Sequence, residues 1–225
     1  MIFANRREAG KLLADKLASR GYDGEDTTII YALPRGGVVL ANEVARKLNI
    51  PLDLILVRKI GHPLNEEYAI GAIAENGEPV VSEDARQEVD DVWLAEQVNK
   101  SRAEIERRRE VYMGGALPVS PQNKTAIIVD DGVATGLTAR AAAEYLRGRG
   151  AGKVILAVPV LPKETLDKFI NNHFVDDVVA IEAPRVYLGA VGAYYRKFNQ
   201  LNDQDVIRIL TRFKDRSLAS YDKTY

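Results

Sequence analysis

The chain contains no cysteine, which excludes disulfide bridges, thiolate metal sites and catalysis by a thiol. It also lacks an apolar run of the roughly 18 residues that a membrane-spanning helix needs, and residues 1–8 lack the pattern of a secretory signal. Charge of one sign is not in excess, because 31 lysines and arginines oppose 32 aspartates and glutamates. These absences predict a cytoplasmic protein for which neither membrane nor nucleic acid is an expected partner, and any anion site must be local.

The composition is that of an ordinary globular protein, with 46% hydrophobic residues. It predicts a single domain over residues 1–225. Apolar β-branched runs alternate with segments of helical periodicity. The expected strands are 27–33, 52–59, 125–129, 153–160 and 177–181, and the expected helices are 5–20, 38–45, 83–113, 139–147, 163–171 and 203–213. Glycines, prolines and asparagines between residues 61 and 79 predict a long, mobile connection. Together these elements indicate an α/β fold with a parallel, about five-stranded sheet flanked by helices.

The strongest local signal is an apolar strand that runs directly into two carboxylates, Asp130 and Asp131. In an open α/β sheet, ligands bind beyond the carboxyl ends of the strands, so both side chains are expected to meet a ligand. A loop of small residues follows and opens a helix, where backbone N–H groups and the helix dipole favour an anion. We therefore expect a phosphate group to bind to Ala134, Thr135, Gly136, Leu137 and Thr138.

Four other interpretations of this segment fit the residues less well. An Asp-Gly hairpin turn requires a second strand, whereas residues 138–146 favour a helix. The Gly-Lys-Ser/Thr ending of a nucleotide-binding P-loop and the dinucleotide fingerprint are both absent. A hydrolase with a Gly-x-Ser-x-Gly nucleophile elbow is not indicated either.

Residues 127–138 resemble the signature of the type I phosphoribosyltransferase family, which has a hydrophobic strand, two acidic residues and a loop containing threonine and glycine. Residues 33–37, Leu-Pro-Arg-Gly-Gly, look like the pyrophosphate loop of the same family. The resemblance extends over most of the chain and is greatest to a group of uncharacterised bacterial and archaeal members. It implies a core of about residues 25–183 and a small hood formed by residues 1–24 and 184–225.

The resemblance implies magnesium-dependent transfer of a 5-phosphoribosyl group from phosphoribosyl pyrophosphate to a nitrogenous acceptor such as a nucleobase or its precursor, in a homodimer. Asp130 and Asp131 would be the catalytic residues, holding the ribose hydroxyls beside the positive charge that develops in the transition state. Mg²⁺ would neutralise diphosphate oxygens without a cage of protein ligands. The residues implied to bind pyrophosphate are Arg35, Gly36, Gly37, Arg58 and Lys59.

The sequence leaves the acceptor unidentified, and it leaves open a non-catalytic regulator that senses phosphoribosyl pyrophosphate or a nucleotide on the same fold. His62 is a candidate for acid-base work because the 61–79 segment resembles the flexible catalytic loop of the family. His173, at a predicted helix end, is a weaker candidate. Stacking on the acceptor and plain packing explain the last aromatic cluster equally well: Tyr187, Tyr194, Tyr195 and Phe198.

Overall fold

A five-stranded parallel sheet forms the centre of the molecule, with strands in the order β2-β1-β6-β7-β8. The structure is a computed structural model that describes residues 1–22 and 27–221, without the side chains of residues 67 and 214–221. The predicted core boundary near residue 25 and the end of the predicted hood, 222–225, lie outside the described residues. The predicted α/β fold is confirmed. The strands are β1 (Thr28–Ala32), β2 (Leu52–Leu54), β6 (Thr125–Val129), β7 (Lys153–Val160) and β8 (Asp177–Glu182).

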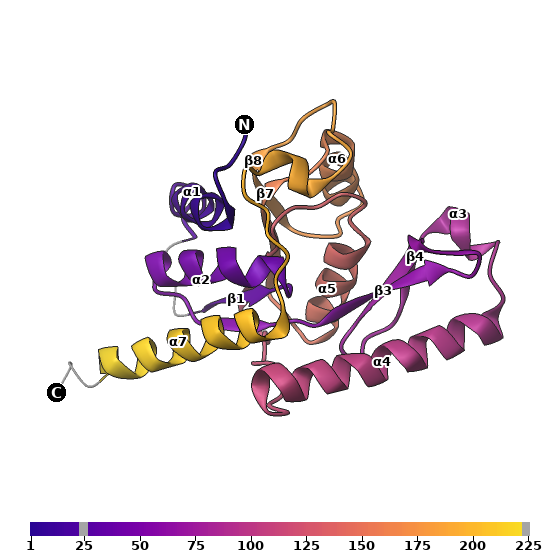
Figure 1. Cartoon of the computed structure of the whole chain (residues 1–225), viewed down its shortest axis with the longest axis horizontal. Coiled ribbons are helices and arrows are strands. Elements are labelled where there is room, and N and C mark those ends of the chain that lie inside the picture. Colours follow the sequence, from indigo (N-terminus) through magenta and orange to yellow (C-terminus); the bar gives the residue numbers. More distant parts are fainter. Residues whose placement is uncertain (23–26, 222–225) are drawn as a thin grey trace.

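Helices cover both faces of this sheet (Figure 1), and each face has its own apolar core. Along β1, Ile30 and Ala32 pack into one core and Ile29 and Tyr31 into the other, because successive strand side chains point to opposite faces. This explains why the strands are largely apolar on both faces. The first core includes α1 (Arg6–Ala18), α2 (Gly36–Leu48) and α7 (Asp203–Tyr221), and the second includes α5 (Leu137–Gly148) and α6 (Lys163–Asn171).

An arm projects from one side of the sheet (Figure 1), and its three strands form an antiparallel sheet in the order β3-β4-β5. The expected mobile connection over residues 61–79 is therefore wrong for most of its length. Gly61 and Gly71 serve close strand packing instead of turns: a Cβ on Gly61 would lie 2.3 Å from the Glu66 carbonyl oxygen. The elements of the arm are β3 (Val57–His62), β4 (Asn65–Ala74), β5 (Val80–Val81), α3 (Glu83–Arg86) and α4 (Asp91–Met113).

Two predicted elements are divided in the structure. The strand expected over 52–59 becomes β2 of the parallel sheet and β3 of the arm, so Arg58 and Lys59 belong to the arm. The helix expected over 83–113 becomes α3 and α4, because the Asp90 side chain accepts hydrogen bonds from the N–H groups of Val92 and Trp93 and caps a new helix start.

Buried charges attach the arm to the sheet. Arg109 of α4 contacts the carboxylate of Glu75 at the end of β4, and its Nη2 donates to the Leu54 carbonyl at 3.0 Å. Its Nη1 lies 3.7 Å from the Asp53 carboxylate. Burial raises the pKa of Glu75, and the charge of Arg109 opposes this effect. Arg109 therefore supplies the positive charge that faces both buried carboxylates at this junction.

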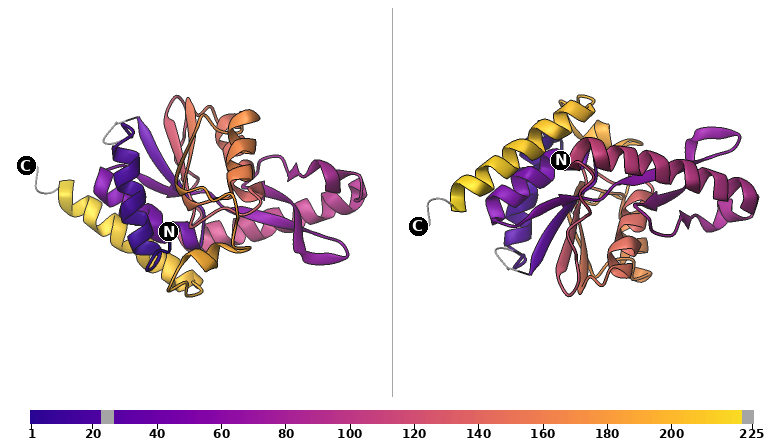
Figure 2. Two further views of the ribbon diagram at one scale, coloured as in Figure 1. Left: turned by 90° about the horizontal axis from the view of Figure 1, so that it is seen from above. Right: turned by 90° about the horizontal axis from the view of Figure 1, so that it is seen from below.

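The terminal segments meet beside the sheet. The Phe3 N–H donates to the Tyr194 carbonyl at 2.8 Å, next to a short 3₁₀ helix, η1 (Val191–Tyr194). Seen from above and below (Figure 2), α7 and the arm extend toward opposite ends of the molecule. Within residues 1–22 and 27–221, no helix combines the length and apolar character needed to span a bilayer.

Candidate functional site

The two sequence motifs meet at one edge of the sheet because β1 and β6 are neighbours. The pairing of Ala32 with Val129 brings the loops that follow these strands together, and the Leu33 N–H donates to the Val129 carbonyl at 2.9 Å. A Cβ on Gly36 would lie 1.8 Å from Asp131 Oδ2, and one on Gly37 would lie 2.5 Å from the Val129 carbonyl oxygen. Only glycines permit this approach, which joins the predicted pyrophosphate loop to the carboxylate pair. The peptide bond before Arg35 is cis.

The carboxylate pair is partly shielded from water, and the Asp131 side chain is 14% exposed. Burial, followed by the charge of Asp131, raises the pKa of Asp130 well above its usual range. Burial also raises the pKa of Asp131, while Arg6 opposes this effect. The positive charge of Lys59, from β3, lowers the pKa of Asp130, so this side chain acts electrostatically on the pair. Groups that donate hydrogen bonds or carry positive charge would be held strongly at such a pair.

Arg6 reaches the site from the start of α1, and no motif in the sequence indicated this. Its Nε donates to Asp131 Oδ2 at 2.7 Å, its Nη1 donates to the Asn199 carbonyl at 2.8 Å, and its guanidinium lies 3.7 Å from the centre of the Phe198 ring. From the same side, the Tyr195 hydroxyl donates to the Asp131 carbonyl at 2.5 Å. Because α1 and the 195–199 segment are far apart in the chain, only the fold reveals this cluster.

The loop after the carboxylates has the form expected of an anion cradle. Ala134 and Thr135 are exposed, and helix α5 begins directly after Gly136, which has φ of 87°. Within the described part of the chain, the backbone N–H groups of residues 134–136 donate to no other residue. The Thr165 hydroxyl holds the loop from below by donating to the Ala134 carbonyl at 3.0 Å. Free N–H groups at a helix N-terminus suit a phosphate.

The predicted pyrophosphate residues do not all gather in one place. Arg35 donates through Nε to Asp203 Oδ1 at 3.1 Å and through Nη1 to the Leu201 carbonyl at 3.2 Å. Arg58 instead faces α4, with Nη1 3.9 Å from the Glu104 carboxylate. Adjacent strand residues point to opposite faces, so Lys59 lies toward the carboxylate pair and Arg58 away from it.

A cavity of about 380 Å³ opens beside the pyrophosphate loop. Three arginines line it, including Arg108 of α4, a residue that the sequence interpretation did not select. Arg108 Nε lies 2.8 Å from the Glu104 carboxylate. The lining residues are Arg6, Pro34, Arg35, Gly36, Arg108, Phe198, Gln200 and Leu201. An anionic ligand is the natural occupant of a cavity with this lining.

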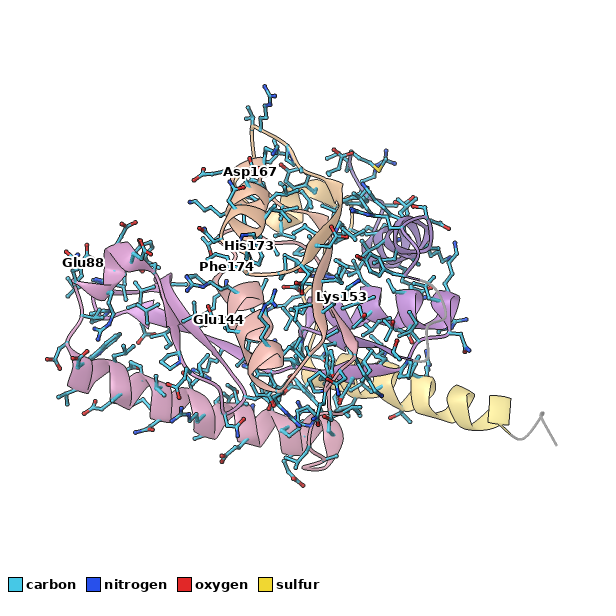
Figure 3. The ribbon with its side chains drawn as sticks, turned by 180° about the vertical axis from the view of Figure 1, so that it is seen from behind. Glu88, Glu144, Lys153, Asp167, His173 and Phe174 are labelled. Carbon is cyan, nitrogen blue, oxygen red and sulfur yellow. The ribbon has the colours of Figure 1, made fainter. Side chains whose placement is uncertain are left out.

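Neither histidine lies at the carboxylate pair. His62 Nε2 is 3.5 Å from the Glu88 carboxylate, and Figure 3 shows Glu88 at the outer end of the arm. His62 Nδ1 accepts a hydrogen bond from the Leu64 N–H at 3.2 Å. His173 is exposed beside α5 and α6, near the labelled Phe174 (Figure 3). The structure as described brings no histidine to the site.

The aromatic cluster forms two groups. Tyr195 and Phe198 lie 4.9 Å apart between ring centres, and both contact the site through Arg6 or Asp131. Tyr187 stacks on Tyr194 at 5.4 Å, and the buried Tyr187 hydroxyl has no hydrogen-bond partner within the described residues. Packing therefore explains the buried Tyr194 and Tyr195, whereas Phe198 is partly exposed and lines the cavity beside Arg6.

Strand β6 of the parallel sheet is followed by two carboxylates and a small-residue loop at the start of α5, and the neighbouring β1 is followed by a glycine loop that touches the carboxylates. This arrangement at the carboxyl ends of parallel strands suits a phosphorylated ligand. The family model described as the phosphoribosyl transferase domain matches residues 2–182. The chain therefore belongs to this family, and the predicted membership is confirmed.

Similar proteins agree with this assignment. The chain is 39% identical over 213 residues to two Mycobacterium tuberculosis proteins, "Putative phosphoribosyl transferase MT0597" and "Putative phosphoribosyl transferase Rv0571c". The match covers 94% of this chain but 47% of theirs, so the chain spans about half the length of these relatives. The crystal structure of TT1426 from Thermus thermophilus superposes with a TM-score of 0.78 at 38% identity, over 95% of this chain and 99% of that one.

Proposed function

We propose that the chain catalyses magnesium-dependent transfer of the 5-phosphoribosyl group from phosphoribosyl pyrophosphate to a nitrogenous acceptor, with release of pyrophosphate. The observation that carries this proposal is the contact of Gly36 and Gly37 with Asp130 and Asp131. It puts a loop suited to pyrophosphate directly beside carboxylates suited to ribose. Family membership supports the same reaction.

In the proposed mechanism, Asp130 and Asp131 accept hydrogen bonds from the ribose 2′ and 3′ hydroxyls. Departure of pyrophosphate leaves positive charge on the anomeric carbon, and nearby carboxylates stabilise that charge most where water is excluded. Because burial raises the pKa of both carboxyl groups, the free enzyme holds them at an electrostatic cost. Ribose hydroxyls and the developing cation offset that cost, so the interaction strengthens along the reaction.

The phosphate groups of the donor would bind on either side of the ribose. Residues 134–138 would hold the 5-phosphate through backbone N–H groups and the hydroxyls of Thr135 and Thr138. Gly36, Gly37, Arg35 and Lys59 would hold the pyrophosphate. Arg58 keeps a secondary role in this scheme, adding positive charge from the neighbouring arm, because its side chain faces Glu104. A leaving group held by fixed cations departs more readily.

The site fits magnesium that arrives with the donor. Within the described ranges no three acidic, histidine or cysteine side chains converge on a metal position. Asp130 and Asp131 nevertheless provide the oxygen ligands that Mg²⁺ accepts, and Mg²⁺ keeps much of its water when diphosphate supplies the other ligands. When bound, the ion would neutralise diphosphate charge, while the chain holds the ribose and the 5-phosphate.

The acceptor would bind against Phe198, which lines the cavity beside the predicted pyrophosphate loop and where a flat nitrogenous ring can stack.

The expected homodimer is supported by exposed apolar side chains on the arm, including Leu64, Tyr68 and Val92. The homodimer stays a prediction, as does the cytoplasmic location.

The decisive experiment is a screen of purines, pyrimidines and their precursors for magnesium-dependent release of pyrophosphate from phosphoribosyl pyrophosphate. At least one acceptor is expected to support turnover, with none when magnesium is chelated. Binding of the donor in calorimetry without turnover on any acceptor would favour the regulator that senses this compound. Absence of magnesium-dependent donor binding would rule out both.

A second prediction concerns the glycine that touches Asp131. Gly36→Ala places a methyl carbon 1.8 Å from Asp131 Oδ2, so either the carboxylate or the loop must move. We expect affinity for phosphoribosyl pyrophosphate, measured by calorimetry, to fall by at least about tenfold, since each hydrogen bond to a charged group contributes roughly 1.5–3 kcal/mol.

The matched control for this change is Gly148→Ala. Gly148 ends α5, and an added Cβ there meets no atom within 4 Å. Donor affinity should not change in the control. Equal affinity in the Gly36→Ala protein would show that the loop does not take part in donor binding.

A further inference from the structure

A second cavity, of about 360 Å³, adjoins the site described above and lies between the start of α1, the middle of α2 and α7. Figure 1 shows α2 lying between α1 and α7. Arg6 and Leu201 line both cavities and therefore stand between them. We call this second cavity the α1–α2–α7 groove; it is lined by Asn5, Arg6, Arg7, Val39, Asn42, Glu43, Lys197, Asn199, Leu201, Asp205, Arg208, Ile209 and Arg212.

The groove concentrates positive charge in a chain whose formal net charge is −1. Its five cationic side chains face only two carboxylates. One of these, Asp205, is already engaged, because it lies 3.4 Å from Arg208 Nη2 and accepts a hydrogen bond from the Asn202 N–H at 3.1 Å. In the part of the chain that is described, three cations of the groove form no ion pair: Arg7, Lys197 and Arg212.

Unpaired cations gathered around a hollow repel one another unless an anion occupies it. These come from three separate segments, α1, residues 197–201 and α7, so an anion in the groove would be contacted from several sides. Arginine guanidinium groups bind phosphate oxygens through paired N–H donors. The side chains of Asn5, Asn42 and Asn199 add uncharged hydrogen-bonding groups, and Val39 and Ile209 provide apolar contact.

We propose that the α1–α2–α7 groove is a separate binding site for a small anion that carries two or more phosphate groups. The volume of the groove suits a small molecule. The number of unpaired cations exceeds what a single phosphate would neutralise. The formal net charge of −1 for the whole chain favours a small ligand over the backbone of a nucleic acid.

The test is calorimetric titration of the full chain with inorganic tripolyphosphate in the absence of magnesium. The variant Arg208→Ala with Arg212→Ala removes two exposed cations of the groove that have no part in the proposed reaction. Its affinity for tripolyphosphate is expected to fall by at least tenfold. The control, Arg86→Ala with Lys153→Ala, removes two exposed positive charges from other parts of the molecule and should bind as the unmodified chain does. Thermal melting checks that both variants fold.

The pyrophosphate loop is the competing site for this probe, so the titration is repeated with Arg35→Ala. Binding that survives Arg35→Ala and is lost in the groove variant supports the proposal. Equal affinity in the groove variant and its control overturns it, as does binding lost only with Arg35→Ala. A single-stranded RNA oligonucleotide that binds through Arg208 and Arg212 when tripolyphosphate does not would also overturn it. Titration of each protein with phosphoribosyl pyrophosphate and magnesium tests the proposed function separately.

Discussion

Replacing Asp130 and Asp131 together with asparagine is expected to lower turnover by a factor of at least about 10², without making the protein less stable at neutral pH. Both carboxyl groups are partly buried, and this burial raises the pKa of each. Asparagine removes the charge that stabilises the transition state and also removes the cost of burying that charge. Turnover is measured as pyrophosphate release, and stability as the midpoint of unfolding in urea.

The pH dependence of stability follows from the same pair. Its folded pKa values lie above the unfolded value of about 4, so the native state keeps protons that the unfolded chain has released. Stability of the unmodified chain therefore decreases as the pH rises from about 4 through the raised pKa values. Urea midpoints at about pH 5 and about pH 8 should differ less in the double asparagine variant than in the unmodified chain.

The chain provides a matched control in a second adjacent pair, Asp176 and Asp177. This pair lies at the amino end of β8, away from the carboxyl ends at which the site is built. Asp176 accepts a hydrogen bond from the Val154 N–H at 2.7 Å, and Asp177 pairs with Arg20 at 3.2 Å. Their double asparagine variant should lose stability and keep turnover. Loss of turnover in both double variants would mean that the reaction is merely sensitive to damage to the fold.

Arg109→Met is expected to destabilise the protein by about 3–5 kcal/mol, the largest of the expected effects on stability. The substitution leaves the Glu75 carboxylate buried without its cation, beside Asp53. Asp53 still accepts hydrogen bonds from the backbone N–H groups of Leu54 and Val119. The loss of stability therefore comes mainly from Glu75. Chemical denaturation measures the change as a shift in the urea midpoint at constant slope.

Adding Glu75→Gln to Arg109→Met should recover part of the lost stability, because the uncompensated charge is then gone. Arg107→Met on the exposed side of α4 is the control, and it should leave the urea midpoint nearly unchanged because an exposed ion pair contributes little to stability. A small effect of Arg109→Met, similar to that of the control, would contradict a structural role for the buried charges.

The sequence predicted the parallel sheet well because its strands are largely apolar on both faces and alternate with clear helices. The arm was missed for a physical reason. In the sequence, Gly61 and Gly71 look like residues that form turns. The strand pairing shows instead that each glycine lets the backbone of a neighbouring strand approach closely. Likewise, Asp90 starts a new helix inside a segment whose composition is helical throughout.

The candidate site likewise contains residues that the sequence indicated and residues that it did not. Asp130, Asp131 and the loop at Gly36 could be found because each is a local motif after a strand. Arg6 and Arg108 could not, since each reaches the site from a helix whose sequence neighbours give no indication of it. Side chains that converge through tertiary packing leave no periodic or spaced pattern that can be detected in the sequence.

The site can form only after β1 and β6 have paired, because it is built from the loops that follow these two strands. The whole arm lies between these two strands in the chain, and its hairpin and helix involve mostly local contacts. Closing the long loop from Ala32 to Val129 costs more chain entropy than forming the hairpin does, and parallel pairing between distant segments is slow. Ligand-binding ability should therefore appear only when this long-range pairing closes, after local secondary structure has formed. A ligand held between the two loops would in turn favour the fully folded chain over every form in which these strands are separated.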